Sequence, residues 1–242
     1  MNILAIGAHP DDIEMQCAGT LALYAQAGHK VFMAIATSGN VGSPTHTRDE
    51  IGAIRKQEQL NSCAMIGAEL IWMGFDDEWL MYDRETRYRF IDTIRQADPD
   101  IMFIHGPGDY HPDHRISGQV AEDARIPASV RLVETDLPYI TKVPHMFYMD
   151  NPTGIGFEPE AYVDISSVMK LKQDMLRAHV SQDAWIRAVY GDDVSITDMM
   201  DKNAASRGQQ MNVAFAEGFR EVKTYPRTGN FGLLPGFGGR AQ

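Results

Sequence analysis

Two short segments of the sequence carry histidine and aspartate in the same order. His9-Pro10-Asp11-Asp12 lies near the start of the chain, and His111-Pro112-Asp113-His114 follows much further along. Two imidazoles and one carboxylate are a ligand set that catalytic zinc accepts, because three protein ligands leave a fourth position open for water. His9, Asp12 and His114 supply such a set. The two segments therefore predict a catalytic metal site.

Asp11 lies between the first two candidate ligands and cannot easily point in the same direction as they do. A carboxylate in that position is free to act as a general base on the attacking water. The alternative is structural, since aspartate is a favoured N-cap and either Asp11 or Asp12 could cap a helix. Two such turns with the same residue types favour the metal site over a capped turn.

Each segment follows an apolar run typical of a buried strand and opens a helical pattern. Strands are predicted at residues 2–8, 30–37, 69–73, 100–105, 145–150 and 161–165, and helices at 12–28, 48–66, 84–97, 113–125, 167–180 and 198–217. The Gly- and Pro-rich tail at 228–242 is predicted to be extended or partly disordered.

The alternation of strands and helices predicts an α/β fold, with a Rossmann-like, doubly wound, mostly parallel sheet and helices on both faces. In the common strand order 3-2-1-4-5, strands one and four are neighbours, so both His-Pro-Asp loops flank the switch point where such sheets bind ligands. No linker or repeat interrupts the sequence. We expect a single domain over 1–242, with the Rossmann-like core at about 1–150 and C-terminal helices and a tail at about 151–242.

Composition excludes some functions. Lys+Arg is 22 and Asp+Glu is 33, which gives a net charge of −11. This acidity argues against broad binding to nucleic acid or anionic membranes. Cys17 and Cys63 lack metal-motif spacing and predict reduced thiols in a cytoplasmic protein. The chain opens directly on a predicted strand, and no apolar run suits a signal peptide or a membrane span, so no membrane insertion is expected.

The segment Ala8-His9-Pro10-Asp11-Asp12-Ile13-Glu14 resembles the Ala-His-Pro-Asp-Asp-x-Glu signature of the PIG-L/LmbE-like family of zinc-dependent N-acetylglucosaminyl deacetylases. His111-Pro112-Asp113-His114 resembles the second signature of that family. The resemblance covers most of the first half of the chain. It implies Zn²⁺, or another divalent metal such as Fe²⁺, on His9, Asp12 and His114, with Asp11 as the base.

The same resemblance implies roles for two further residues. His111, in its protonated form, would stabilise the tetrahedral oxyanion or protonate the leaving amine, and Asp113 would orient His111. Whether Asp11 or His111 supplies the proton to the amine stays open. Some relatives carry a tyrosine two positions before this histidine, whereas here Asp109 stands there and Tyr110 directly precedes His111.

Weaker matches concern the substrate. Arg55 resembles a family arginine that binds sugar hydroxyls, and the alternative is a surface pair with Glu58 at helical i,i+3 spacing. Asp77, in Gly74-Phe75-Asp76-Asp77, resembles an aspartate that contacts the sugar. The alternative is an exposed loop acid, which is also the expectation for Asp76 and Glu78. Residues 179–182 resemble a family segment near the active site.

Together these features predict a hydrolase that removes the N-acetyl group from an N-acetylglucosamine-type amino sugar or its conjugate. The expected partner is this small-molecule amino-sugar substrate, with no nucleic acid, and a homo-oligomer is expected because relatives are often oligomers. Two alternatives stay open. One is a zinc amidase acting on a larger thiol-conjugate amide, and the other is a catalytically silent sugar- or nucleotide-binding domain. Asp11 beside three intact ligands argues against a silent domain.

Overall fold

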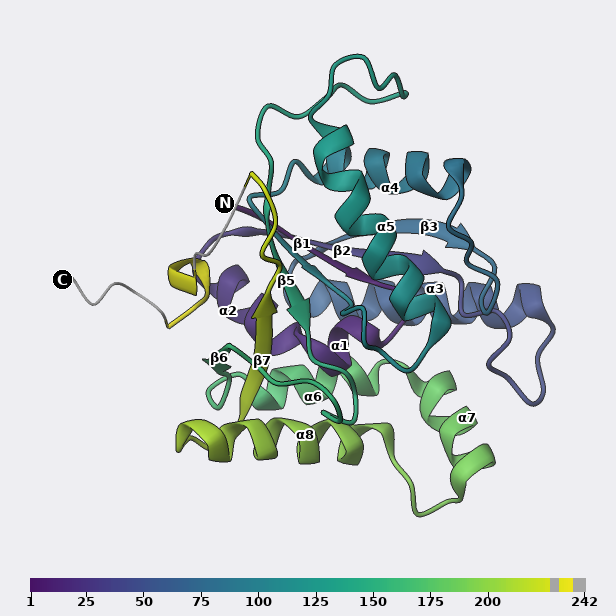
Figure 1. The fold of residues 1–242 in the computed structure, drawn as a ribbon. Helices are drawn as coiled ribbons and strands as arrows, with labels where there is room; N and C mark the ends of the chain where they lie inside the picture. The colour runs from purple at the N-terminus through teal and green to yellow at the C-terminus, as the bar shows by residue number, and fades with distance from the viewer. Residues whose placement is uncertain (227–230, 237–242) are drawn as a thin grey trace.

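The computed structural model describes residues 1–226 and 231–236, and Figure 1 shows its single sheet between layers of helices. Within these residues the strands are β1 (Asn2–Gly7), β2 (Lys30–Thr37), β3 (Glu69–Phe75), β4 (Ile101–Ile104), β5 (His145–Met149), β6 (Ala161–Asp164) and β7 (Ala216–Glu221). The helices are α1 (Asp12–Gln16), α2 (Ala18–Gln26), α3 (Arg48–Met65), α4 (Arg84–Ala97), α5 (Pro112–Ala128), α6 (Met169–Arg177), α7 (Val180–Tyr190) and α8 (Ile196–Met211), with a short 3₁₀ turn, η1 (Phe231–Leu233).

The strand order is β3-β2-β1-β4-β5-β7-β6. The first five strands in this order pair in parallel, and β7 runs antiparallel to both of its neighbours. The predicted fold class, a doubly wound and mostly parallel α/β sheet, is confirmed. So is the predicted order of the first five strands. Because β1 and β4 pair directly, the loops that follow them leave the same edge of the sheet side by side.

Alternate residues of the strands face opposite layers, as the two-residue period of a strand requires. Ile3 and Ala5 of β1 pack in the core that contains α1, α2, α6 and α8, whereas Leu4 and Ile6 pack in the core that contains α4 and α5. Figure 1 shows these helices on the two sides of the sheet. No helix in the described part of the chain is long and apolar enough to cross a membrane.

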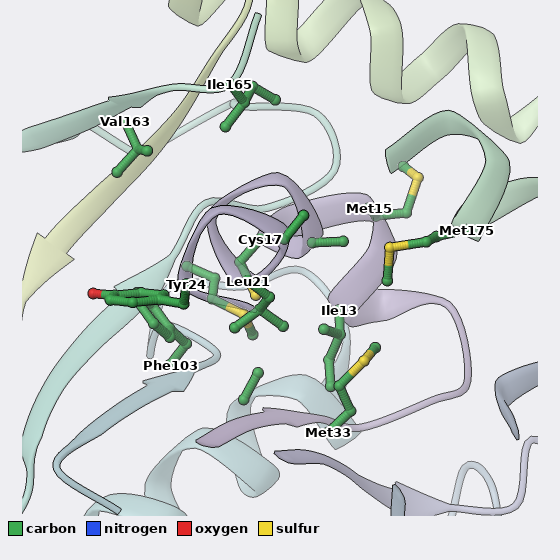
Figure 2. Packing of buried hydrophobic residues seen from close by; sticks show 14 of the residues in the cluster. Ile13, Met15, Cys17, Leu21, Tyr24, Met33, Phe103, Val163, Ile165 and Met175 are labelled. Atoms are coloured by element: carbon green, nitrogen blue, oxygen red, sulfur yellow. The ribbon is translucent and has the colours of Figure 1, made fainter. Parts of the chain in front are cut away.

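The first of these cores fixes the segment that follows β1. Figure 2 shows Ile13 and Leu21 of α1 and α2 between Met33 and Phe103 of the sheet on one side and Met175 of α6 on the other. Ile13 and Leu21 have no exposed surface. Side chains buried in this way hold the backbone of α1 in one position, and with it the loop that carries the first His-Pro-Asp segment.

The predicted helix at 12–28 is in fact two helices. Cys17 has φ −143°, which ends α1, and α2 starts at the next residue. A tertiary contact explains the break. The Glu217 carboxylate of β7 accepts hydrogen bonds from the Gly19 and Thr20 N–H groups at 2.8 and 2.7 Å. In an unbroken helix these N–H groups would bond to the preceding turn instead.

The second half departs further from prediction. The helix expected at 198–217 ends at Met211, because Asn212 adopts the left-handed conformation (φ 59°) that closes many helices, and Ala216 opens β7. The helix expected at 167–180 spans Met169–Arg177, and α7 was missed. Within the tail predicted to be extended, η1 is instead a 3₁₀ turn. The Tyr24 hydroxyl donates a hydrogen bond to the Leu233 carbonyl oxygen of this turn. Residues 227–230 and 237–242 lie outside the described residues.

Candidate metal centre and active site

The turn after β1 places the side chains of His9 and Asp12 next to each other. Oδ2 of Asp12 accepts the backbone N–H of His9 at 2.7 Å, which curls the turn onto itself. Asp11 stands at the N-cap position of α1 with φ 109°, and among the described residues its side chain receives no capping hydrogen bond. The helix-cap alternative for Asp11 is therefore wrong.

The turn after β4 places the second segment. His111 is the N-cap of α5, and Pro112 occupies the first helical position, where its fixed φ suits a helix start. His114 follows in the first turn, and its Nδ1–H donates to Oδ1 of Asp109 at 2.9 Å. The ring is thereby fixed with Nε2 turned toward the loop after β1. Figure 1 shows α5 beginning at the same edge of the sheet as α1.

The three predicted ligands meet between these loops. His9 Nδ1 lies 3.1 Å from His114 Nε2 and 3.5 Å from Asp12 Oδ2. His114 Nε2 lies 3.2 Å from Asp12 Oδ1. All three residues are buried, with at most 9% of each exposed. Two imidazole nitrogens and a carboxylate thus converge on one small volume, as a divalent metal requires.

Each histidine of this cluster has a carboxylate on its other nitrogen. His114 has Asp109 on Nδ1, and His9 Nε2 lies 3.0 Å from Oδ1 of Asp77. Metal-binding histidines usually have such carboxylate partners, which fix the tautomer and make the ligand nitrogen more basic. The arrangement of these residues therefore fits a bound metal ion.

The charges of the cluster fit a cation as well. Burial lowers the pKa of His114, but the carboxylates of Asp12 and Asp109 outweigh burial and raise that pKa to about 9. In His9, too, the effect of burial is outweighed by carboxylates, here those of Asp113, Asp12 and Asp77, and the pKa rises well above its ordinary value. Carboxylates that raise the pKa of both histidines make this a place where positive charge is stabilised.

Other donors lie close enough to enter the cluster. Groups with ligand atoms within 4.8 Å of one another are His9 with His111 and His114, Asp12 with His105 and His114, and His9 with Asp77 and Asp113. His105 Nε2 accepts the backbone N–H of Ala8 at 3.0 Å, so its lone pair is already engaged. The ring of His105 stacks on that of His114 with centroids 4.2 Å apart, which supports the ligand from behind.

Arg55 is buried and lies beside Asp11, with 3.7 Å between its Nη2 and Oδ2 of Asp11. The same guanidinium donates to the carbonyl oxygens of Pro10 and Gly39. The alternative of a surface pair with Glu58 is wrong, because Glu58 accepts hydrogen bonds from Ser181 instead. Burial raises the pKa of Asp11 to about 6, although Arg55 opposes the rise.

The structure gives Asp77 and Asp113 other partners than expected. Asp77 is buried against His9, so it is not an exposed loop acid, and its carboxylate is directed to the metal cluster. Asp113 does not orient His111 through its carboxylate. That carboxylate accepts the Glu78 N–H and lies 3.5 Å from His9 Nε2, while the backbone N–H of Asp113 donates to His111 Nδ1.

His111 lies at the mouth of the cluster, and its ring meets that of His9 edge-on with centroids 4.7 Å apart. Burial and the nearby His9 and His114 lower the pKa of His111. The structure thus favours a neutral ring over the protonated form expected from sequence. Tyr110 beside it is 66% exposed, and its ring centroid lies 5.5 Å from that of His114.

The segment at 179–182 also reaches the site. His179 is fully buried, and its Nε2 lies 3.4 Å from Oε1 of Glu14 in the first signature. Ser62 and Gln59 of α3 donate to the same oxygen. Glu14 of α1 therefore contacts both α3 and the residue that precedes α7, in keeping with the resemblance of residues 179–182 to a segment near the active site.

A doubly wound sheet whose switch point holds a His/Asp cluster that could bind a metal is typical of metal-dependent α/β enzymes. Comparison with protein families makes the identification closer, because the model of the GlcNAc-PI de-N-acetylase (PIG-L) family matches residues 4–125 of the 242. The chain belongs to this family. The predicted family is thus confirmed, and with it the enzyme class, a hydrolytic N-deacetylase.

Individual relatives extend the likeness over most of the chain. The diacetylchitobiose deacetylase of Thermococcus kodakarensis is 29% identical over 198 residues, which are 76% of this chain and 72% of the relative. The solved N,N'-diacetylchitobiose deacetylase of Pyrococcus horikoshii has a TM-score of 0.78 and 25% identity, covering 91% of this chain and 83% of that chain. The 4-oxalmesaconate hydratase of Pseudomonas putida is 23% identical over 243 residues, 93% of this chain and 89% of the relative.

Proposed function

We propose that the chain is a zinc-dependent deacetylase of an N-acetylglucosamine-type amino sugar or its conjugate, with His9, Asp12 and His114 as the metal ligands. The observation that carries this proposal is the convergence of His9 Nδ1, His114 Nε2 and the Asp12 carboxylate within 3.1–3.5 Å. The carboxylates on the far nitrogens of both rings support it.

A bound Zn²⁺ would polarise the acetamide carbonyl group and lower the pKa of water. Asp11 would take the proton of the attacking water, since its carboxylate is buried beside the ligands and Arg55 holds it in place. His111 would donate its Nε2–H to the carbonyl oxygen as that oxygen gains charge. Asp11, which then carries that proton, can return it to the departing amine, whereas His111 could supply one only in its protonated form.

The charges around the cluster favour a neutral substrate. The carboxylates of Asp12, Asp77 and Asp113 approach His9, Asp109 contacts His114, and Glu78 contacts His111. Such a surrounding repels an anion more than a neutral amide. An N-acetyl amino sugar therefore suits the site better than a carboxylate anion such as 4-oxalmesaconate, although a relative that spans most of the chain is a hydratase of that compound.

Arg55 and Asp77 were expected to bind the sugar, and this expectation stays a prediction. Both are buried and engaged with Asp11 and His9. We propose that they also hold those two residues in position. A cytoplasmic location and a homo-oligomer are likewise predictions from sequence.

Metal content tests the ligand set. The wild-type protein should bind about one zinc ion per chain, and His9→Ala, Asp12→Ala and His114→Ala should each weaken binding by at least roughly tenfold. The matched control is His46→Ala, which removes a histidine whose ring, among the described residues, is hydrogen-bonded to Ser43 and Thr45 on an exposed loop. Full metal occupancy in all three ligand variants would refute the assignment.

A further inference from the structure

Glu78 follows β3 in an unusual backbone conformation. Its φ is 71°, in the left-handed region that a residue with a Cβ seldom adopts. Its N–H donates to Oδ2 of Asp113 at 2.8 Å, so the loop after β3 is joined to the first turn of α5. Strained conformations of this kind persist where surrounding contacts impose them, and they gather at functional sites.

The side chain of Glu78 points to His111. Its Oε1 lies 3.3 Å from Nε2 of that ring, with 51% of the Glu78 side chain and 19% of the His111 side chain exposed. Glu78, which the sequence predicts to be an exposed loop acid, thus contacts a residue at the mouth of the metal cluster. Its neighbour Asp77 contacts His9 from the same loop.

The other nitrogen of His111 decides where the ring carries its proton. Nδ1 accepts the backbone N–H of Asp113 at 3.2 Å. A neutral imidazole that accepts at Nδ1 carries its hydrogen at Nε2. The Nε2–H of His111 therefore faces the Glu78 carboxylate, and it is the hydrogen that the proposed reaction needs.

We propose that Glu78 is a positioning residue for His111. Its carboxylate holds the Nε2–H of the ring toward the mouth of the site until the carbonyl oxygen of the substrate accepts the hydrogen bond from that Nε2–H in its place. The left-handed backbone is what brings the carboxylate within reach. This assignment rests on the proposed deacetylase function, because that function gives His111 its task.

Two variants separate the carboxylate from the backbone. Glu78→Gly removes the acceptor but suits a φ of 71°, so the hydrogen bond from residue 78 to Asp113 should persist. Glu78→Gln keeps an acceptor oxygen at the same reach. The matched control is Asp76→Asn, because Asp76 is an exposed acid on the same loop with hydrogen bonding to Asn40.

With an N-acetyl amino sugar as substrate, Glu78→Gly should lower kcat roughly tenfold with little change in KM, since misplaced catalytic groups cost up to about a hundredfold. Glu78→Gln should recover most of this loss, and Asp76→Asn should behave like the wild type. A wild-type kcat in Glu78→Gly would overturn the assignment.

A second measurement needs no substrate. In ¹⁵N-histidine-labelled, zinc-loaded protein, NMR should show the Nε2–H of His111 protected from exchange with water in the wild type and in Glu78→Gln. The protection should be lost in Glu78→Gly. Equal protection in all three proteins would overturn the Glu78 assignment. Absence of acetate release from every N-acetyl sugar tried with the wild type would instead overturn the proposed function, so the two failures are distinguishable.

Discussion

Carboxylates contact the two candidate histidine ligands on the side that faces away from the cluster. Asp77 and Asp109 each approach the nitrogen of a histidine that faces away from the cluster, and Oδ2 of Asp12 is held by the backbone N–H of His9. Every ligand is thus fixed by a second contact before any ion arrives. A site fixed in this way loses little entropy when it binds a metal.

Asp11 is the residue whose replacement should separate chemistry from metal binding. Asp11→Asn should leave metal content unchanged, and asparagine tolerates the left-handed backbone at this position. The loss of a general base should lower kcat by about 10²–10⁴-fold. Steady-state kinetics alongside metal analysis checks this, and a variant within about threefold of wild-type kcat would remove Asp11 from the mechanism.

The residues of the two signatures could be predicted from sequence because their types and order are local. Their partners could not. In the sequence Asp109 stands out only as a neighbour of Tyr110, and Glu78 only as a loop acid, yet both contact a histidine of the second segment. For Asp109 the signal was its spacing of five residues from His114. For Glu78 the contact joins loops after different strands, which no local pattern reveals.

Among the elements, β7 joins the second half of the chain to the first. Glu217 of β7 accepts hydrogen bonds from N–H groups in the first turn of α2. It also forms an ion pair with Lys172 of α6, with 2.5 Å between Lys172 Nζ and Glu217 Oε1. Both side chains are almost fully buried. A Cβ at Gly19 would lie 2.8 Å from Ile165 and 3.0 Å from Oε1 of Glu217, so α2 can approach Glu217 this closely only because residue 19 is a glycine.

Removal of the Glu217 charge should therefore be costly. Glu217→Gln leaves the Lys172 ammonium group buried without its counter-ion, which should lower the free energy of unfolding by about 3–5 kcal/mol. Urea unfolding followed by circular dichroism measures this. The control is Glu160→Gln, which breaks a more exposed pair with Lys223 and should cost about 0–1 kcal/mol. Equal stability of the two variants would contradict the assigned role of Glu217.

Helix α7 is held more weakly, since none of its residues, all of them described, is buried. Asp183 accepts hydrogen bonds from Arg187 and from the Ile196 N–H at the start of α8. Burial raises the pKa of Asp183, but these hydrogen bonds outweigh it and lower the pKa below its ordinary value. The stabilisation is therefore full above the unfolded pKa of about 4 and is lost as pH falls through the folded pKa.

Hydrogen exchange should reveal this loss. In the wild type, exchange in α7 should rise relative to α2 when pH falls from about 5 to about 3, after correction for intrinsic rates. In Asp183→Asn the ratio should already be high at the upper pH and should change little. A wild-type ratio that stays constant over this range would contradict the role of Asp183.

The elements that sequence predicted well are those with a strong period, above all the parallel strands and the helices α3, α4 and α5. The errors have tertiary causes. The break at Cys17 follows from the hydrogen bonds that Glu217 accepts at the start of α2. Glu217 lies 198 residues after Gly19 in the chain. The strand β7 was hidden because Ala216–Glu221 mixes charged and apolar residues, and it is fixed by pairing with β5 and β6.

On the scale of the whole molecule, one sheet edge gathers the chemistry. The loops after β1, β3 and β4 contribute the cluster and its neighbours, and the parallel register of those strands brings the loops to the same edge. The net charge of −11 is consistent with a site lined by carboxylates. The carboxylates that line the site and the negative net charge both favour a neutral amide over an anionic substrate.

Release of acetate tests the central claim most directly. Protein stripped of metal and then loaded with one equivalent of Zn²⁺ would be given N-acetylglucosamine, N,N'-diacetylchitobiose, a plain N-acetyl amine and a thiol-conjugate amide, with acetate and free amine both measured. We predict metal-dependent release of equal amounts of acetate and amine from at least one of the sugars, at a far higher kcat/KM than from the plain amine. Metal-loaded protein that releases no acetate from either sugar would contradict the account, and turnover of the thiol conjugate alone would support the amidase instead.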